Sequence, residues 1–146
     1  MEIVKIFTDG CCKGNPGPGG YGALIIHNGK TKELKGGSKS TTNNIMELTA
    51  AVVGLEALKK PCEVELTTDS QYLKKGMTEW IEGWIKKGWI NASRQPVKNK
   101  EIWQELHRLS KIHKVTWKWV KAHNGHPENE RADALANEGM SAPSNR

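Results

Sequence analysis

Two apolar segments of this chain end in the same way, with threonine, aspartate and then a small residue. The first ends at Asp9 in the run IFTDG, and the second ends at Asp69 in the run LTTDS. Both runs are rich in residues that favour strands. If the two strands are parallel neighbours, both aspartates emerge at the same carboxyl edge of a sheet, where open α/β folds place their sites. Either aspartate alone is equally typical of a turn or a helix cap.

The amino-terminal part of the chain predicts an antiparallel meander. Strands are expected over residues 2–8, 21–27 and 31–36, and Asn28-Gly29 is a strong hairpin signal between the last two. The stretch between the first two strands is dense in glycine and proline and is expected to be loop. Its members are Gly10, Gly14, Pro16, Gly17, Pro18, Gly19 and Gly20.

Residues 43–60 change to a helical pattern. Apolar side chains recur on one face at Ile45, Leu48, Ala51, Val52, Leu55 and Leu58. Thr41, Thr42 and Asn43 are candidate caps, and Pro61 closes the helix. A strand over 63–68 follows, and the order strand, helix, strand makes it a parallel partner of an earlier strand.

The rest of the chain continues as mixed α/β structure. One or two helices are expected over 70–87, a loop over 88–98, a helix over 100–113 and a strand over 114–120. A turn over 122–125 leads into a last helix that begins at Pro127 and ends near Asn137. Residues 139–146 are expected to fray. With neither a repeat nor a linker, residues 1–146 predict one domain.

Two further acids belong to predicted helices. Glu47 lies at the edge of the buried stripe of its helix, and Asp133 is bracketed by small residues that favour close packing. Gathering such carboxylates is costly, because two unit charges about 4 Å apart repel by roughly 4 kcal/mol at an effective dielectric of about 20. Hard divalent cations with oxygen ligands, above all Mg²⁺, remove that cost and suit phosphodiester hydrolysis. The alternative for Glu47 is a boundary residue with its head in water.

Composition limits the partners and the cellular compartment that are expected for this chain. Lys and Arg number 22 and Asp and Glu 16, a net charge of +6 that is compatible with nucleic acid. No apolar run approaches membrane-spanning length, and Met1 leads directly into a strand-like segment without a signal peptide. Cys11, Cys12 and Cys62 suit neither a disulfide framework nor a zinc site. These features favour a cytoplasmic protein.

Six ordered stretches resemble the type 1 ribonuclease H family of the compact bacterial kind. They are FTDGCCKGNPGPGGYGA, TTNNIMEL, TDSQYL, WIEGWIKKGW, PVKN and WVKAHNGHPENERADALA. The resemblance extends to about Asn137 and implies a ribonuclease H-like α/β fold. That fold has a five-stranded mixed sheet flanked by helices, in which strands 1-2-3 form an antiparallel meander and strands 4 and 5 are parallel.

The same resemblance implies an endonuclease that hydrolyses the RNA strand of RNA–DNA hybrids and leaves 5′-phosphate and 3′-hydroxyl ends. Two Mg²⁺ ions, with Mn²⁺ as an alternative, would be held by Asp9, Glu47, Asp69 and Asp133. His123 would shuttle a proton or assist product release. A zinc pairing of His123 with His126 lacks further ligands nearby. A monomer with no obligate protein partner is the default expectation.

Substrate contacts follow from the resemblance as well. Asn15, Asn43 and Gln71 would read 2′-hydroxyls in the minor groove of the hybrid, and Thr42 would hold a DNA phosphate. Gly10 and Cys12 would meet the RNA strand, and Asn44 would also contact the substrate. Asn15 and Asn43 can serve as turn and cap residues at the same time. A segment that binds the DNA strand would comprise Trp80, Trp84, Lys86, Lys87, Trp89, Arg94 and Lys98. Trp80 and Trp84 are four residues apart, which is also typical of packing within a helix.

Two alternatives remain open from the residues alone. A module that only binds nucleic acid would use the positive charge without chemistry, but inward carboxylates would repel phosphate. A DNA integrase or junction resolvase would share the acidic cluster. The set Asn15, Asn43 and Gln71 argues against that class, because amides suit the recognition of 2′-hydroxyls.

Overall fold

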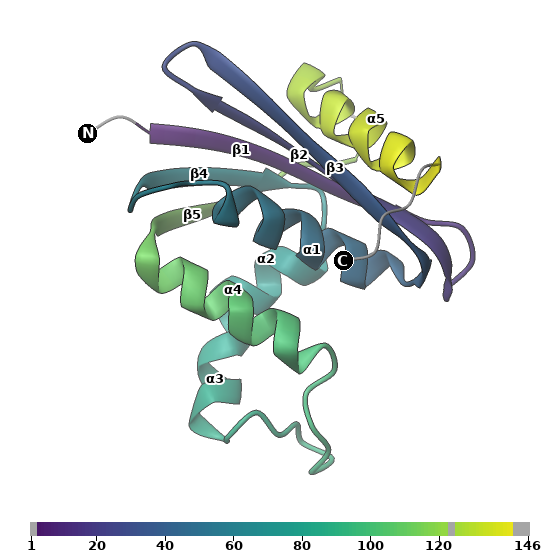
Figure 1. The fold of residues 1–146 in the computed structure, drawn as a ribbon. Coiled ribbons are helices and arrows are strands. Elements are labelled where there is room, and N and C mark those ends of the chain that lie inside the picture. Colours follow the sequence, from purple (N-terminus) through teal and green to yellow (C-terminus); the bar gives the residue numbers. More distant parts are fainter. Residues whose placement is uncertain (1–2, 123–124, 142–146) are drawn as a thin grey trace.

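A five-stranded mixed sheet forms the centre of the computed structural model, which describes residues 3–122 and 125–141 (Figure 1). Its strand order is β3-β2-β1-β4-β5. The first three strands pair antiparallel, and β4 pairs parallel with both β1 and β5. The predicted fold class is therefore confirmed. The strands are β1 (Ile3–Cys12), β2 (Gly17–His27), β3 (Lys30–Thr41), β4 (Glu63–Thr68) and β5 (Lys114–Trp119).

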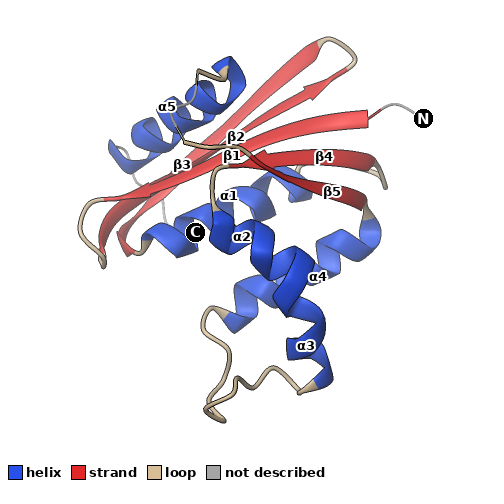
Figure 2. Cartoon of the chain, turned by 180° about the vertical axis from the view of Figure 1, so that it is seen from behind, coloured by secondary structure: helices blue, strands red, loops and turns tan. Residues whose placement is uncertain are grey.

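Helices cover the two faces of this sheet unequally. The helix α5 lies over β2 and β3 on one face, whereas α1, α2 and α4 lie on the other (Figures 1 and 2). The segment from α3 to the start of α4 projects away from the sheet (Figure 2). The helices are α1 (Asn43–Glu56), α2 (Gln71–Lys75), the π-helical turn η1 (Gly76–Trp80), α3 (Ile81–Lys86), α4 (Lys100–Ile112) and α5 (Pro127–Ser141).

The main core lies between the sheet and the pair α1 and α4. Ile6 and Leu66 point from the sheet, Leu48 points from α1, and Trp103 points from α4; all are fully buried. Because α1 presents its predicted apolar stripe to this core, its register is fixed by burial. The helix then sets which of its polar residues face the carboxyl ends of the strands.

The glycine-dense stretch near the amino terminus is mostly strand, so the prediction of a loop was wrong. β1 extends to Cys12 and β2 begins at Gly17. Close packing explains the glycines, because a Cβ added at Gly20 would lie 2.0 Å from the Ala136 carbonyl oxygen of α5. A Cβ at Gly22 would lie 2.6 Å from the Ala132 carbonyl oxygen. These strands are therefore glycine-rich because a helix backbone rests directly on them.

The predicted helical stretch over 70–87 consists of two helices, α2 and α3, joined by the π turn η1. At Gly76, where the turn begins, an added Cβ would meet the Trp103 ring at 2.0 Å. The large indole thus occupies the space that a side chain would need. Trp103 also donates its indole N–H to the Tyr72 hydroxyl at 3.2 Å, which joins α4 to α2.

Two helix ends differ from prediction. α1 ends at Glu56 instead of residue 60, with Ala57 as its C-cap. α5 continues to Ser141, beyond the expected end near Asn137. Gly139, expected in a frayed tail, is buried, and a Cβ there would lie 2.1 Å from the Gly36 carbonyl oxygen. Packing on β3 therefore keeps this last turn helical.

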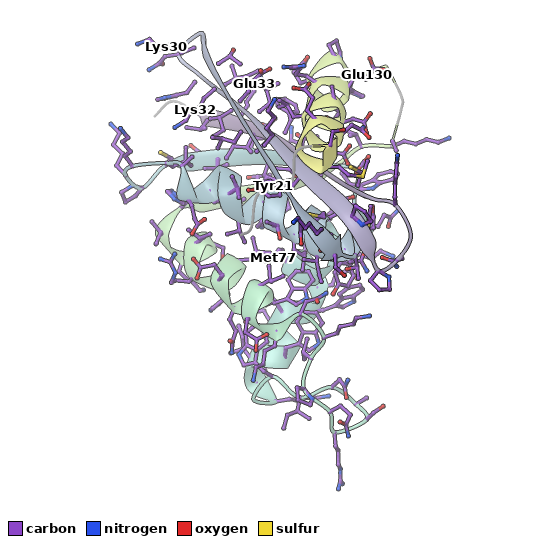
Figure 3. All side chains as sticks on the ribbon, turned by 45° about the vertical axis from the view of Figure 1, so that its right-hand side comes forward. Tyr21, Lys30, Lys32, Glu33, Met77 and Glu130 are labelled. Atoms are coloured by element: carbon purple, nitrogen blue, oxygen red, sulfur yellow. The ribbon has the colours of Figure 1, made fainter. Side chains whose placement is uncertain are left out.

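Ion pairs on the surface also join α5 to β3. Arg131 of α5 donates to Glu33 at 2.8 Å, and Lys35 donates to Glu138 at 2.8 Å. Glu33 lies on β3 near the β2–β3 hairpin (Figure 3). Exposed pairs of this kind contribute little each to the free energy of unfolding. None of the helices within 3–122 and 125–141 has the length and hydropathy needed to cross a bilayer.

Candidate active site

Three carboxylates from distant parts of the sequence converge at the carboxyl edge of β1 and β4. One oxygen each of Asp9, Glu47 and Asp69 lies within 4.8 Å of the others. Parallel pairing places Thr8 opposite Thr68, so the aspartates that follow these threonines emerge side by side. The duplicated strand ending seen in the sequence therefore produces the juxtaposition that it predicted.

Glu47 reaches the two aspartates because α1 packs directly on β1. A Cβ added at Gly10 would lie 2.5 Å from the Glu47 backbone nitrogen, so glycine is required for this approach. Glu47 is only 5% exposed, and its Oε1 is buried with no hydrogen-bond partner among the described residues. The expectation that Glu47 lies at the edge of the buried stripe understated its burial.

Burial and mutual repulsion disfavour the charged forms of these acids. Burial, followed by the charges of Asp69 and Asp133, raises the pKa of Asp9 to about 9, although the Gly10 N–H bond to Oδ1 at 2.9 Å acts in the opposite direction. Burial and the charges of Asp9 and Asp69 raise the pKa of Glu47 well above its ordinary value. Without a cation, the cluster thus retains protons that isolated carboxylates would lose.

Asp133 approaches the cluster from the opposite face of the sheet. It lies in the second turn of α5, is half-buried, and contributes to the raised pKa of Asp9. Its position depends on the close seating of α5 on the glycines of β2. The four predicted carboxylates therefore come from β1 just beyond its last pair with β4, from the end of β4, and from two helices on opposite faces.

The donor set fits a hard divalent cation. Its ligands are carboxylate oxygens, one of which, Oε1 of Glu47, is buried and unpaired in the described structure. Oxygen-only ligands are those that Mg²⁺ prefers, and a cation would offset the repulsion that raises the pKa values. His123, the remaining predicted catalytic residue, lies outside the described residues.

Several predicted substrate contacts gather at the amino terminus of α1. Thr42 caps the helix, because its Oγ1 accepts from the Ile45 N–H at 3.1 Å. Asn15 reaches from the β1–β2 loop, and its Oδ1 accepts from the Asn43 N–H at 3.1 Å. Asn43 and Asn44 are exposed in the first turn. The cap and turn roles considered from the sequence are thus present together with an exposed polar surface.

Two other predicted contacts flank the acids. Cys12, at the end of β1, is half-buried, and its thiol donates to the Gly14 carbonyl at 2.9 Å. Gln71 is the first residue of α2, two positions beyond Asp69, and is exposed. Both lie at or next to the strand ends that carry Asp9 and Asp69.

The predicted tryptophans form an aromatic cluster under the projecting segment. The ring centroids of Trp80 and Trp84 are 5.9 Å apart, and those of Trp84 and Trp89 are 6.3 Å apart. Trp84 also packs on the buried Trp103 at 5.3 Å. Most of this aromatic surface serves packing, and Trp80 is the most open member at 37% exposed.

Four cations lie on the segment supported by this cluster, which we call the basic segment. All four side chains are exposed, and they belong to the end of α3 and the loop that follows: Lys86, Lys87, Arg94 and Lys98. Gly88, Trp89 and Arg94 adopt positive φ angles of 73°, 66° and 61°, which turn the chain back toward α4. The segment therefore presents positive charge away from the acidic cluster.

One residue at the site was absent from the prediction. Trp119, at the end of β5, donates its indole N–H to the Asp69 carbonyl oxygen at 3.0 Å. The alternation of Val115, Trp117 and Trp119 predicts only a strand. The position of Trp119 at the last strand residue before a loop was the available signal, since such positions line the functional edge of an α/β sheet.

Known proteins share both this sequence and this architecture. The family model described as RNase H matches residues 1–141. A ribonuclease H of Chelativorans sp. (strain BNC1) is 62% identical over 140 residues, which are 96% of this chain and 86% of that protein. LC9-RNase H1, described as a type 1 RNase H with the type 2 active-site motif, has a TM-score of 0.87 and 31% identity over 99% of this chain and 74% of its own. LC11-RNase H1, solved in complex with RNA/DNA hybrid, has a TM-score of 0.74 and 26% identity, covering 94% and 96%.

Proposed function

The chain belongs to the ribonuclease H family, and from this premise we propose that it is an endonuclease that hydrolyses the RNA strand of RNA–DNA hybrids. The observation that carries the proposal is the convergence of Asp9, Glu47 and Asp69, with oxygens within 4.8 Å, at the edge of β1 and β4. A cluster with this repulsion is of little use to a protein that only binds phosphate. The products would carry 5′-phosphate and 3′-hydroxyl ends.

The cofactor would be Mg²⁺, two ions per site, with Mn²⁺ as an alternative. Asp9 would help to hold both ions, Asp133 would help to hold the ion that activates water, and Glu47 and Asp69 would hold the ion that stabilises the leaving group. The ions would supply an activated water and charge stabilisation at the leaving oxygen. The unpaired Oε1 of Glu47 supports this assignment, because a buried carboxylate oxygen needs a partner.

The chain's own residues would select and orient the hybrid. The side-chain oxygen of Asn15, Oδ1, accepts a hydrogen bond from the Asn43 backbone N–H. The side-chain NH₂ group of Asn15 would therefore be the group that donates to a 2′-hydroxyl. Asn43, Asn44 and Gln71 would extend this contact across the minor groove. Thr42 would hold a DNA phosphate beside the amino terminus of α1, where the helix dipole favours an anion.

Contacts further from the acids would hold the two strands of the hybrid in register. Gly10 and Cys12 would meet the RNA backbone next to Asp9. The basic segment would contact the DNA strand, with Trp80, Trp84 and Trp89 supporting it. His123 would shuttle a proton or assist product release. We further propose a cytoplasmic monomer with no obligate protein partner and no membrane attachment.

The direct test is cleavage of a hybrid whose RNA strand is end-labelled, with and without Mg²⁺, by the wild type and by Asp69→Asn. Single-stranded RNA and RNA duplex of the same sequence serve as substrate controls. We expect Mg²⁺-dependent cutting of the hybrid alone, lost in the variant. Tight binding without cutting would favour a binding module, and cutting of DNA would favour a related nuclease with another substrate.

A further inference from the structure

The corner between β4 and α2 is held by a succession of hydrogen bonds. The last bond of the strand ladder runs from the Val120 N–H to the Thr68 carbonyl at 3.0 Å. The Thr68 hydroxyl accepts from the Ser70 N–H at 3.0 Å, and the Ser70 hydroxyl caps α2 by accepting from Leu73 at 3.1 Å. Asp69 lies between these bonds, where the strand has ended and the helix has not begun.

The carbonyl group of Asp69 is bound by a side chain from the neighbouring strand. Trp119 lies opposite Thr68 in the β4–β5 register, so its indole reaches one residue further and donates to the Asp69 oxygen at 3.0 Å. The Trp119 side chain is 38% exposed, so much of its apolar ring lies in solvent and is not used for packing. Its hydrogen bond to a ligand residue gives the ring a specific task.

We propose that Trp119 is a positioning residue that holds the Asp69 peptide so that the carboxylate stays with those of Asp9 and Glu47. Asp69 is the least buried of the three, and its neighbours repel it. A free backbone at this corner would let its side chain rotate toward solvent. Groups that orient ligands commonly govern metal affinity as much as the ligands themselves. This inference rests on the proposed metal-dependent function.

The test compares Trp119→Phe with Trp117→Phe, the same change two residues earlier on the core side of the strand. Mg²⁺ affinity is measured by NMR titration of the Gly10 amide, which donates to Asp9 and so reports on the site without catalysis. We expect Trp119→Phe to weaken Mg²⁺ binding about tenfold. At limiting Mg²⁺ its kcat should fall, excess Mg²⁺ should restore kcat, and KM for the hybrid should be unchanged. Trp117→Phe should alter thermal stability but not Mg²⁺ affinity.

A second variant isolates the N–H group. Incorporation of 3-benzothienylalanine at position 119 keeps the bicyclic ring and replaces N–H by sulfur, so the fold is preserved while the donor is lost. Weakened Mg²⁺ binding in this variant supports the proposal, and wild-type affinity in a folded variant overturns it. A fall in kcat without a change in Mg²⁺ affinity also overturns it. Failure of the wild type to cleave hybrids would refute the proposed function, whereas the titration would still test Trp119.

Discussion

The protonation of Asp9 makes the free energy of unfolding of the metal-free protein depend on pH. The carboxyl group is 6% exposed, and burial together with Asp69 and Asp133 raises its pKa to about 9. Between the ordinary value of 3.8 and about 9, the folded state therefore holds a proton that the unfolded state releases. By linkage, the free energy of unfolding of the metal-free protein falls as the pH rises through this window.

Replacing Asp9 with Asn should stabilise the metal-free protein while abolishing cleavage. The change removes a buried acid and its repulsion, so we expect a gain of about 1–3 kcal/mol near pH 8. Stability should also depend less steeply on pH between 5 and 8 than in the wild type. Thermal unfolding of the wild type and the variant in EDTA, at pH 5 and at pH 8, measures this difference in stability. A variant less stable than the wild type at pH 8 would contradict the role given to burial and repulsion.

Mg²⁺ should stabilise the wild type and lose that effect when Glu47 is changed to Gln. Since an ion that binds only the folded state raises its stability with concentration, the midpoint of thermal unfolding should rise as Mg²⁺ is added. Gln keeps the size of the Glu47 side chain but removes the charge that would hold the ion. A matched control is Glu101→Gln, an exposed acid in the first turn of α4. Equal Mg²⁺-induced shifts in all three proteins would argue against metal ligation by Glu47.

Among the elements, those with a strong local pattern could be predicted from sequence, and those shaped by contact with another element could not. The apolar period of α1 and the Asn28-Gly29 hairpin are local signals, and the structure contains both. The strand character of Gly10 and Gly20 depends on helices that press against them, which a local reading cannot detect. The same contact explains why the deep burial of Glu47 was missed although its role as a site acid was proposed.

The site residues also divide into those with a local sequence pattern and those whose role depends on contact with another element. Asp9 and Asp69 could be found because each follows an apolar run, and their register needed only parallel pairing. The resemblance, not the pattern, supplied Asn15 and the basic segment. The position of Trp119 at the end of a strand was a signal for the edge of the sheet, but its bond to Asp69 could not be predicted, because it depends on the register of an edge strand some fifty residues later in the chain.

Two glycine substitutions, one under α5 and one at an open position of α3, should change the free energy of unfolding in opposite directions. Gly20→Ala would place a methyl group 2.0 Å from the Ala136 carbonyl oxygen, so we expect a loss of about 2–3 kcal/mol. Gly83→Ala, in α3 with no neighbour within 4 Å of the added Cβ, should gain about 0.5–1 kcal/mol through helix propensity. Chemical denaturation of both variants measures this. Similar effects of the two changes would contradict the direct contact between α5 and β2.

At the scale of the whole molecule, the +6 charge is distributed over separate surfaces. The basic segment occupies the part that projects from the body beyond α3 (Figure 2). Lys30 and Lys32 lie at the far end of the β2–β3 hairpin (Figure 3). That end is the edge of the sheet opposite to the acidic cluster, because β2 runs antiparallel to β1. Of these two groups, the basic segment is the one that we propose contacts the hybrid.

Replacing Lys86, Lys87 and Arg94 together with Ala should raise KM for the hybrid far more than it lowers kcat. If each cation neutralises one phosphate, the slope of log affinity against log salt should fall by about 1 per residue. The matched control replaces Lys30, Lys32 and Lys111, which are equally exposed, with Ala. An unchanged KM at low salt, or the same effect from the control, would remove the basic segment from substrate binding.

The four acids are unevenly spaced along the chain, so they are synthesised at different times during translation. Asp9, Glu47 and Asp69 belong to its first half, whereas Asp133 arrives with α5, the last helix described. A ribosome therefore exposes most of the sheet before it releases the helix that covers β2 and β3 and adds the fourth carboxylate. Until translation passes α5, the nascent chain carries an incomplete centre. On the proposed function, such a chain would lack one of the four acids expected to hold the ions.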